Sequence, residues 1–579
     1  MSQNNPQPKA RIVYPGAAEG PVLFSPVPFP LSGVTFGADG AVNWDGHPLQ
    51  DQSIRDKILV VTEVSGFAGG DWALLSLATR QAAAPKAILC GACNSFLIAG
   101  AILAKIPTVI NLPLEALRAI GGSSHVSIAT DQGAIRYRTG AGESAMVSIT
   151  RDRQPAGGEL RLTDEDQRML DGFHGQVAAE CMKVIVAYAG ALGASRLIDI
   201  ESVHLAGSGY NTTGDVAIDY LDRLVDQGGR VRVPATLNPI AVDLDRWQKP
   251  MRLPSQLHEK QQQMNAAFQR LGFTASYSCV PYWTSIAPRF GANIAWAEHN
   301  AVSYANSVLG ARTNFESNVI TLTAAFTGRM PEYGLYKVEN RRPQIAIEFS
   351  AAITGDEDWR CLGVAAAQRA GDRIPIFLGL QHSPSTHSLR DLCAALGPPW
   401  CASPMLHIPG VTPEASRADL LAEDLSALAE TVRLEPADLE AVRARFAGDV
   451  GLEVDLVALG CPQYSHAEID RVSTRIAGRH ISPRVQLWIW TDPATRAVAE
   501  RSGLVDQIER AGGYVMSGSC GCAACPIQRS GHAFRTMATD STKSCGFISR
   551  VGIRTLFGSM EDCIESAVRG HWPGRAPTF

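Results

Sequence analysis

From residue 196 onward the sequence alternates short strand-like runs with helical segments, and this alternation restricts the fold more than any other feature. Apolar and β-branched runs at 196–200, 230–234, 344–349, 374–380 and 485–491 are separated by stretches with helical periodicity. Strands joined by helices pair in parallel and carry those helices on their faces. We therefore predict an α/β fold whose large domain contains several wound sub-sheets.

The large domain is predicted to begin with a helix. Thr163 is followed three residues later by Asp166, a spacing typical of a helix N-terminus. Apolar residues then recur at spacings of three and four as far as Tyr188. The pattern predicts one amphipathic helix that ends near Gly193.

The first 150 residues have a different pattern. Short apolar runs at 57–64, 86–90 and 108–112 are bounded by Gly and Pro, and long helical patterns are scarce. A chain of 579 residues also exceeds one ordinary core. We predict a small β-rich domain over 1–150, a glycine-rich and polar linker over 140–158, and a large domain over 160–579.

Charge and hydropathy narrow the class of partner. The net charge is −5, and no Lys/Arg cluster is interleaved with aromatic residues, which argues against a nucleic-acid partner. No segment approaches the roughly 18 uncharged apolar residues of a membrane helix, and the N-terminus lacks the apolar core of a signal peptide. We expect a cytoplasmic protein, a monomer or weak homo-oligomer, that binds a small molecule and neither nucleic acid nor a membrane.

Three of the 13 cysteines follow predicted strands directly. They are Cys279, Cys461 and Cys520. Ligands in wound parallel sheets gather beyond the carboxyl ends of the strands, so these cysteines are better placed for chemistry than those inside helical patterns. Three thiolates on an iron–sulfur cluster leave one iron without a protein thiolate, and such an iron can act as a Lewis acid.

Two CxxC pairs offer an alternative use of cysteine. Cys90 and Cys93 form one pair, and Cys522 and Cys525 form the other. Together they could form a four-cysteine zinc site, or act as redox pairs. The pairs lie in different predicted domains and lack the flanking pattern of a zinc ribbon, so the spacing supports zinc only weakly.

Several longer stretches resemble those of one family, the aconitase X branch of the aconitase superfamily. They are MLDGFHG from Met169, IDIESVHLAGSGY from Ile198, RVRVPATLNP from Arg230, CVPY from Cys279, AWAEHNAVSYANSVLGARTNFES from Ala295, IPGVTPEA from Ile408, GCPQYS from Gly460, GSC from Gly518 and TDSTK from Thr539. The first 150 residues are similar, more faintly, to the small swivelling domain that is fused ahead of the large domain in single-chain members.

The resemblance implies an aconitase-like large domain and an iron–sulfur cluster on Cys279, Cys461 and Cys520. A [2Fe-2S] cluster is favoured, and [3Fe-4S] and [4Fe-4S] remain open. It implies a hydro-lyase acting on a small hydroxy carboxylate, with conversion of cis-3-hydroxy-L-proline to pyrroline-2-carboxylate as the first expectation. A different hydroxy acid such as mevalonate 5-phosphate is the alternative, and a non-catalytic cluster-bearing, thiol or zinc protein is a further one.

The chain departs from the family in the loop after the strand that ends near Val64. The family usually has GRGSS there, with a serine that resembles the catalytic base, whereas this sequence reads Ser65-Gly66-Phe67-Ala68-Gly69-Gly70-Asp71. The first serine has become Phe67, and Ser65 stands where the family has arginine. We therefore expect Asp71 or Ser65 to act as the base.

The remaining candidate residues lie in the stretches that resemble the family. Dehydration of a hydroxy acid needs cations that hold the carboxylate and polar groups that orient it. Arg312 and Lys543 are expected to hold the carboxylate, and Lys543 is also a candidate catalytic residue. The candidate substrate-binding residues, with Arg312, are Ser32, His204, Glu298, Asn300, Asn306, Thr313 and Thr542.

Overall fold

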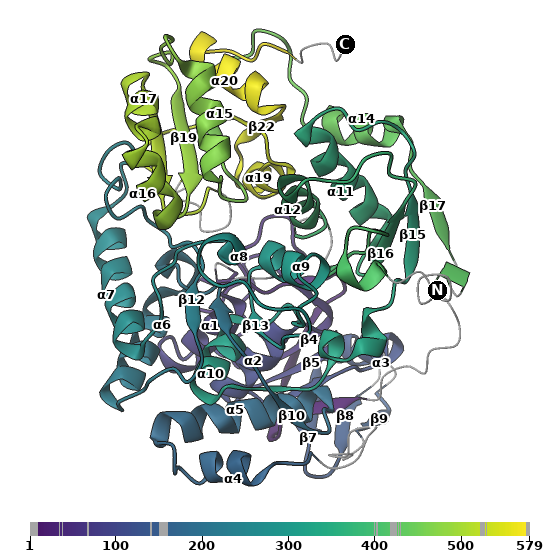
Figure 1. The fold of residues 1–579 in the computed structure, drawn as a ribbon. Helices are drawn as coiled ribbons and strands as arrows, with labels where there is room; N and C mark the ends of the chain where they lie inside the picture. Colours follow the sequence, from purple (N-terminus) through teal and green to yellow (C-terminus); the bar gives the residue numbers. More distant parts are fainter. Residues whose placement is uncertain are drawn as a thin grey trace.

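The computed structural model describes residues 10–574 apart from gaps at 34, 38, 67–68, 139–141, 150–159, 399, 401–402, 417–424, 427, 429, 522–526 and 528–529. A small N-terminal domain is followed by three α/β units. In Figure 1 the second unit (green) and the third unit (yellow-green to yellow) lie above the first unit (teal). The predicted α/β fold with several sub-sheets is confirmed.

The small domain is built on a nine-stranded sheet of order β1-β6-β5-β4-β2-β7-β8-β9, in which β3 also pairs with β4. Its strands are β1 Arg11–Tyr14, β2 Ala17–Ser25, β3 Phe29–Pro30, β4 Ile58–Ser65, β5 Ala87–Ala92, β6 Thr108–Ile110, β7 His125–Ala129, β8 Ala134–Arg138 and β9 Ser144–Ser148. Its helices are α1 Gly70–Thr79, α2 Ser95–Ala104 and α3 Leu114–Gly121. The parallel strands β4, β5 and β6 are joined by α1 and α2.

The small domain is therefore richer in helix than the sequence predicted. Helix α2 has the sequence SFLIAGAILA and is buried from Phe96 to Ile102, so it lacks the polar face that makes a helix recognisable from periodicity. Part of the predicted linker is also wrong, since residues 144–148 form β9. Residues 150–158 of that linker lie outside the described part of the chain.

The first α/β unit carries a parallel sheet of order β12-β11-β13 and an antiparallel pair, β10 with β14. Its elements are α4 Asp164–Leu170, α5 Gln176–Leu192, β10 Leu197–Asp199, β11 Val203–Leu205, α6 Tyr210–Asp226, β12 Ala235–Leu237, α7 Ser255–Leu271, α8 Pro281–Thr284, β13 Ala295–Trp296, α9 His299–Ser307, α10 Asn318–Thr327 and β14 Arg329–Pro331. The single helix predicted from Thr163 is two helices, α4 and α5. Gly172 and Gly175 between them have φ of 87° and 93°, a conformation that ends a helix.

The second and third units each have a wholly parallel sheet, of order β16-β15-β17 and β20-β19-β18-β21-β22. The second contains β15 Ile345–Glu348, α11 Asp356–Ala370, β16 Pro375–Leu378, α12 Thr386–Ala395, β17 Thr431–Arg433 and α14 Pro436–Ala444. The third contains β18 Leu456–Leu459, α15 His466–Ile476, β19 Gln486–Thr491, α16 Pro493–Arg501, α17 Leu504–Arg510, β20 Gly513–Ser517, β21 Thr536–Thr539, α19 Thr542–Ile548, β22 Arg554–Phe557 and α20 Met560–Arg569. Short 3-10 helices span Gly334–Tyr336, Val338–Arg341, Pro413–Ala415 and Ser549–Val551.

One apolar core joins the small domain to the first unit. Trp72 of α1 and Ile98 of α2 belong to the same buried cluster as Met182 of α5, Leu221 of α6 and Phe326 of α10. Across the described residues, no helix combines the length and apolar character needed to cross a membrane.

Candidate active site

A cavity of about 650 Å³, counting its open mouth, lies where the first and third units meet. It is lined by Ala206, Gly209, Thr212, Asn238, Pro239, Cys279, Glu298, Asn300, Gly460, Cys461, Pro462, Gln463, Cys520, Gly521 and Lys543. Many of these residues directly follow β11, β12, β13, β18, β20 or β21. The carboxyl ends of two parallel sheets thus converge on one space, which is the usual place for a ligand in a wound fold.

The three strand-end cysteines all line this cavity. Cys279 precedes α8, Cys461 follows β18, and Cys520 follows β20. Gly460 permits the approach of the Cys461 loop, because it has φ of 90° and a Cβ there would lie 2.2 Å from the carbonyl oxygen of Trp490. Cys461 and Cys520 lie after strands as predicted, whereas the strand expected before Cys279 does not form and Cys279 lies in the loop that leads to α8. All three cysteines nonetheless line the same cavity.

A pKa shift bears on one of these cysteines, Cys279. Burial raises the pKa of the Cys279 thiol well above its ordinary value, and the Glu298 carboxylate raises it further. Such a thiol ionises only against a strong Lewis acid, so a soft metal centre suits it. Among the described residues, no three Cys, His, Asp or Glu side chains form a site for a single metal ion. The residues of the cavity whose chemistry fits an iron–sulfur cluster are the three thiols, because thiolates are the usual protein ligands of such clusters.

The alternative zinc site gains no support from the residues that can be assessed. Cys90 and Cys93 lie in the small domain, and burial raises the pKa of the Cys93 thiol to about 12. A pKa in that range does not fit a redox-active thiol at neutral pH. Cys522 and Cys525 lie outside the described residues.

A buried ion pair forms the polar side of the cavity. The Lys543 Nζ donates to Glu298 Oε1 at 2.7 Å and to Asn300 Oδ1 at 2.8 Å. Burial opposes the charge on Glu298, but the Lys543 ammonium and the Asn238 amide outweigh it and lower the Glu298 pKa below its ordinary value. The cavity therefore presents a carboxylate and an ammonium at neutral pH.

His204 is connected to this ion pair through one intervening side chain, Asn238. Its Nε2 is 3.3 Å from Asn238 Oδ1, and the Asn238 Nδ2 donates to Glu298 Oε2 at 2.8 Å. Burial lowers the His204 pKa to about 4, so the imidazole is neutral at physiological pH. His204 does not line the cavity and can act on a ligand only by orienting Asn238 and Glu298.

Part of the small domain packs against Thr212, which lines the cavity. A Cβ on Gly33 would lie 1.9 Å from the Thr212 carbonyl oxygen, and a Cβ on Gly69 would lie 2.1 Å from the same atom. Ser32, next to Gly33, is buried and bonds to Thr35. Ser65 is exposed at the end of β4. None of these small-domain residues is among the residues that line the cavity.

Asp71 lies farther into the contact between the small domain and the first unit. Its Oδ2 accepts from the Val319 N–H at 2.9 Å, at the start of α10, and its Oδ1 accepts from the Trp72 N–H at 3.0 Å. Burial raises the Asp71 pKa to about 6. This position suits a residue that joins the small domain to the first unit. Of the two predicted bases, Ser65 is exposed and Asp71 is buried.

Four other predicted residues lie outside the cavity lining. Asn306 and Thr313 bond to each other, with the Asn306 Nδ2 donating to the Thr313 carbonyl oxygen at 2.9 Å. Arg312 is half-buried on the segment between α9 and α10, and Thr542 is buried at the start of α19. Their predicted contacts with substrate therefore have no support from this arrangement.

Three polar residues that line the cavity were not predicted. Asn238 directly follows β12, and Gln463 lies two residues after Cys461. Thr212 lies in the first turn of α6. Asn238 and Gln463 fall within stretches that resemble the family, so their position after a strand was an available signal. Thr212 carried no such signal, because it lies two residues beyond the stretch that ends at Tyr210.

A cysteine-lined cavity with a buried Lys–Glu pair, at the carboxyl ends of two parallel sheets, defines an α/β enzyme. Sequence models of the aconitase X swivel domain and of the aconitase X first, second and third domains match residues 7–137, 159–339, 343–444 and 454–569. The chain belongs to the aconitase X family and is a hydro-lyase.

Named relatives agree with this assignment. A cis-3-hydroxy-L-proline dehydratase of Hypocrea jecorina is 30% identical over 596 residues, covering 100% of this chain and 98% of the relative. A phosphomevalonate dehydratase large subunit of Methanothermobacter thermautotrophicus is 34% identical over 391 residues, covering 68% of this chain and 94% of the relative. The crystal structure of Thermococcus kodakaraensis aconitase X in its holo-form matches with a TM-score of 0.63 at 32% identity, covering 70% of this chain and 100% of that one.

Proposed function

We propose that this chain dehydrates cis-3-hydroxy-L-proline to pyrroline-2-carboxylate, with an iron–sulfur cluster held by Cys279, Cys461 and Cys520. The observation that carries the substrate assignment is the charge of the cavity. Among its described lining residues, Lys543 is the cation and Glu298 is the carboxylate. One buried charge of each sign complements a zwitterion, which has a carboxylate and a secondary ammonium.

A phosphorylated substrate fits this charge pattern poorly. A phosphate monoester carries about −1.5 to −2 charges at neutral pH, and the substrate carboxylate adds another. Among its described lining residues the cavity would meet these charges with the single cation Lys543, and it would place the Glu298 carboxylate, 2.7 Å from Lys543, beside them. Ser65, where the family has arginine, supplies no further cation. The full-length match to a relative named cis-3-hydroxy-L-proline dehydratase also favours the amino acid.

The side chains divide the work of dehydration among themselves. In this proposal Lys543 binds the substrate carboxylate and stabilises the negative charge that spreads onto it as the α-proton leaves. Asn300 holds the Lys543 ammonium at 2.8 Å, and Glu298 pairs with the ring ammonium. Ser65, which is exposed at the end of β4, is the proposed proton acceptor, and its hydroxyl would take the α-proton while passing its own proton to solvent water. A cluster on the three thiolates would supply a Lewis acid for the departing hydroxyl group.

Turnover by anaerobically purified, iron-reconstituted protein tests the substrate assignment. We expect formation of pyrroline-2-carboxylate from cis-3-hydroxy-L-proline and no turnover of mevalonate 5-phosphate. A matched control is cis-2-hydroxycyclopentane carboxylate, which keeps the carboxylate and the hydroxyl but lacks the ammonium. Equal kcat/KM for the two ring compounds would refute the pairing with Glu298, and turnover of the phosphate compound alone would refute the substrate.

Cysteine variants test the cluster separately. Alanine at Cys279, Cys461 or Cys520 is expected to remove the visible absorption and most of the bound iron. Cys181 is a matched control because it is buried in the core on α5, away from the cavity. If the Cys181→Ala variant and the three cavity variants kept equal iron, these cysteines would not be the ligands.

A further inference from the structure

Gln463 touches the segments that carry all three cavity cysteines. It is 1% exposed and lies two residues after Cys461, in the loop between β18 and α15. The Cys279 N–H donates to Gln463 Oε1 at 2.9 Å, and the Gln463 N–H donates to Cys279 Sγ at 3.3 Å. The side chain and the backbone of Gln463 therefore each bond the Cys461 loop to Cys279.

The amide nitrogen of the same side chain reaches the third cysteine segment. Its Nε2 lies 3.2 Å from the Tyr277 carbonyl oxygen, 3.1 Å from that of Thr491 and 3.4 Å from that of Ser519. Tyr277 precedes Cys279 by two residues, and Ser519 immediately precedes Cys520. One side chain thus connects backbone atoms that are 184 and 56 residues from it in sequence.

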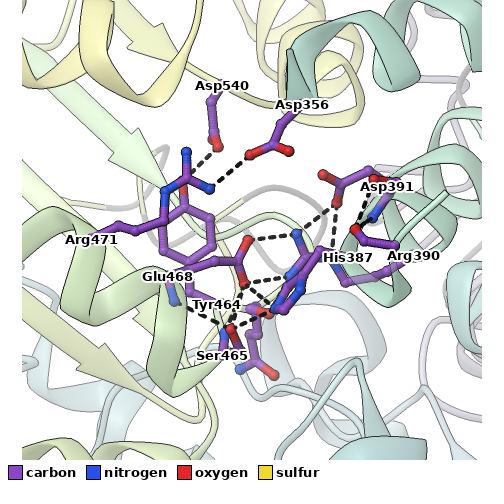
Figure 2. Close-up of polar contacts among 12 residues, drawn as sticks. Asp356, His387, Arg390, Asp391, Tyr464, Ser465, Glu468, Arg471 and Asp540 are labelled. Atoms are coloured by element: carbon purple, nitrogen blue, oxygen red, sulfur yellow. Dashed lines mark hydrogen bonds and ion pairs between the residues drawn. The ribbon is translucent and has the colours of Figure 1, made fainter. Parts of the chain in front are cut away.

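A buried network of charged side chains contacts the backbone carbonyl of Gln463. The Arg390 Nη1 lies 3.4 Å from the Gln463 carbonyl oxygen and donates to Glu468 Oε2 at 2.8 Å. Arg390 is fully buried and also pairs with Asp391, as Figure 2 shows. Gln463 is consequently fixed to α12 of the second unit as well as to the loops of the first and third units.

We propose that Gln463 is a positioning residue that sets the spacing of the loops bearing Cys279, Cys461 and Cys520. The proposal rests on the proposed function in assigning the cluster to these cysteines. Only an amide of this length offers the required acceptor together with a donor. A carboxylate of the same shape would face the carbonyl oxygens with no donor, and a methionine would leave buried polar groups unpaired.

Two variants and one control separate positioning from a general loss of stability. Gln463→Glu keeps the shape of the side chain, and Gln463→Met keeps its length. The control is Gln261→Met, because Gln261 is also fully buried, accepts from the Tyr210 N–H at 2.9 Å and donates to the Ser208 carbonyl oxygen at 2.8 Å. In the part of the chain that the structure describes, the Gln261 side chain bonds to Ser208, Tyr210, Ala241 and Asn265, and none of these is next to a cavity cysteine.

The first measurement is iodoacetamide labelling of the apoprotein, with each cysteine followed by mass spectrometry. Loss of a buried hydrogen bond that closes a loop is expected to raise labelling at Cys279 and Cys520 about tenfold in both Gln463 variants. The second is iron and sulfide content after reconstitution, which should fall below half of wild type. Gln261→Met should resemble wild type in both measurements, even if its melting temperature falls.

The results distinguish this proposal from the proposed function. If wild type binds no cluster but the Gln463 variants still label faster than wild type and Gln261→Met, Gln463 positions the cysteines and the cluster assignment fails. If either Gln463 variant folds with wild-type labelling and wild-type iron content, the proposal is overturned. Equal acceleration in Gln261→Met would also overturn it, because the effect would then be general loosening.

Discussion

Replacement of Lys543 by methionine tests the central ion pair. The ammonium lies 2.7 Å from Glu298 and 2.8 Å from Asn300, and the residue is 8% exposed. Methionine removes the charge but keeps the apolar stem, so the Glu298 carboxylate remains buried without its ionic partner. Breaking a buried ion pair from one side costs about 3–5 kcal/mol, and we expect a loss of that size in the free energy of unfolding.

The Lys543→Met change should also reduce kcat/KM, because it removes the charge that meets the substrate carboxylate. Truncating a buried, hydrogen-bonded charge that meets a ligand costs about 2–5 kcal/mol, which corresponds to roughly 30- to 5,000-fold in kcat/KM. Without the Lys543 ammonium, burial also raises the pKa of Glu298. The double variant Lys543→Met with Glu298→Gln removes the buried charge, so it should recover stability without recovering activity.

Denaturant unfolding of the apoprotein and steady-state kinetics of the reconstituted protein measure the two effects. Lys183→Met is the matched control, because Lys183 is exposed on α5 and should change neither quantity. A folded Lys543→Met protein with kcat/KM within threefold of wild type would refute the role given to Lys543. A double variant no more stable than Lys543→Met would refute the reasoning from the buried carboxylate.

Three further changes probe the small domain. Native Asp71 holds its proton to about pH 6, whereas the unfolded chain releases it near pH 4. The contribution of Asp71 to the free energy of unfolding is therefore fully present below about pH 4 and falls by about 3 kcal/mol as the pH rises through 6. Asp71→Asn should remove this pH dependence in unfolding titrations, and an unchanged slope would contradict the reasoning. Ser65→Ala should lower kcat about 100-fold or more with little change in KM, and full turnover would exclude Ser65 as the proton acceptor. Gly33→Ala brings a Cβ within 1.9 Å of the Thr212 oxygen and should cost about 1–3 kcal/mol, whereas Gly190→Ala, with open space around it, should be tolerated in melting experiments.

The fold class could be predicted because its signal is local. In the third unit β18, β19, β21 and β22 are short apolar runs that are each followed by a helix, so the alternation is visible without tertiary contacts. The same reasoning failed for α2, whose residues Phe96–Ile102 are all buried and show no polar face. It also joined α4 to α5, because the apolar spacing continues across the turn that Gly172 and Gly175 impose.

The candidate site could be predicted mainly where a residue follows its own strand. Cys461, Cys520, Glu298 and Lys543 lie within four residues of a strand end, whereas the strand predicted before Cys279 does not form. All five residues line one cavity. Gln463 also follows a strand, but its importance lies in bonds to Cys279 and Ser519, which depend on how distant loops meet. Arg312 lies in a stretch that is recognisable from sequence but is not among the residues that line the cavity, so its contact with substrate stays a prediction.

The contact between the small domain and the first unit limits how substrate can enter. Trp72, Leu74 and Ile98 of the small domain are at most 3% exposed and share one core with Met182 and Leu221. Exposing a large apolar side chain to water costs about 1.5–3 kcal/mol, so a rigid-body swing that uncovered only these five would cost roughly 8–15 kcal/mol. That is comparable to the whole stability of a typical domain. A movement confined to the neighbourhood of Thr212 would cost less, because the backbones of Gly33 and Gly69 rather than apolar side chains form the contact there.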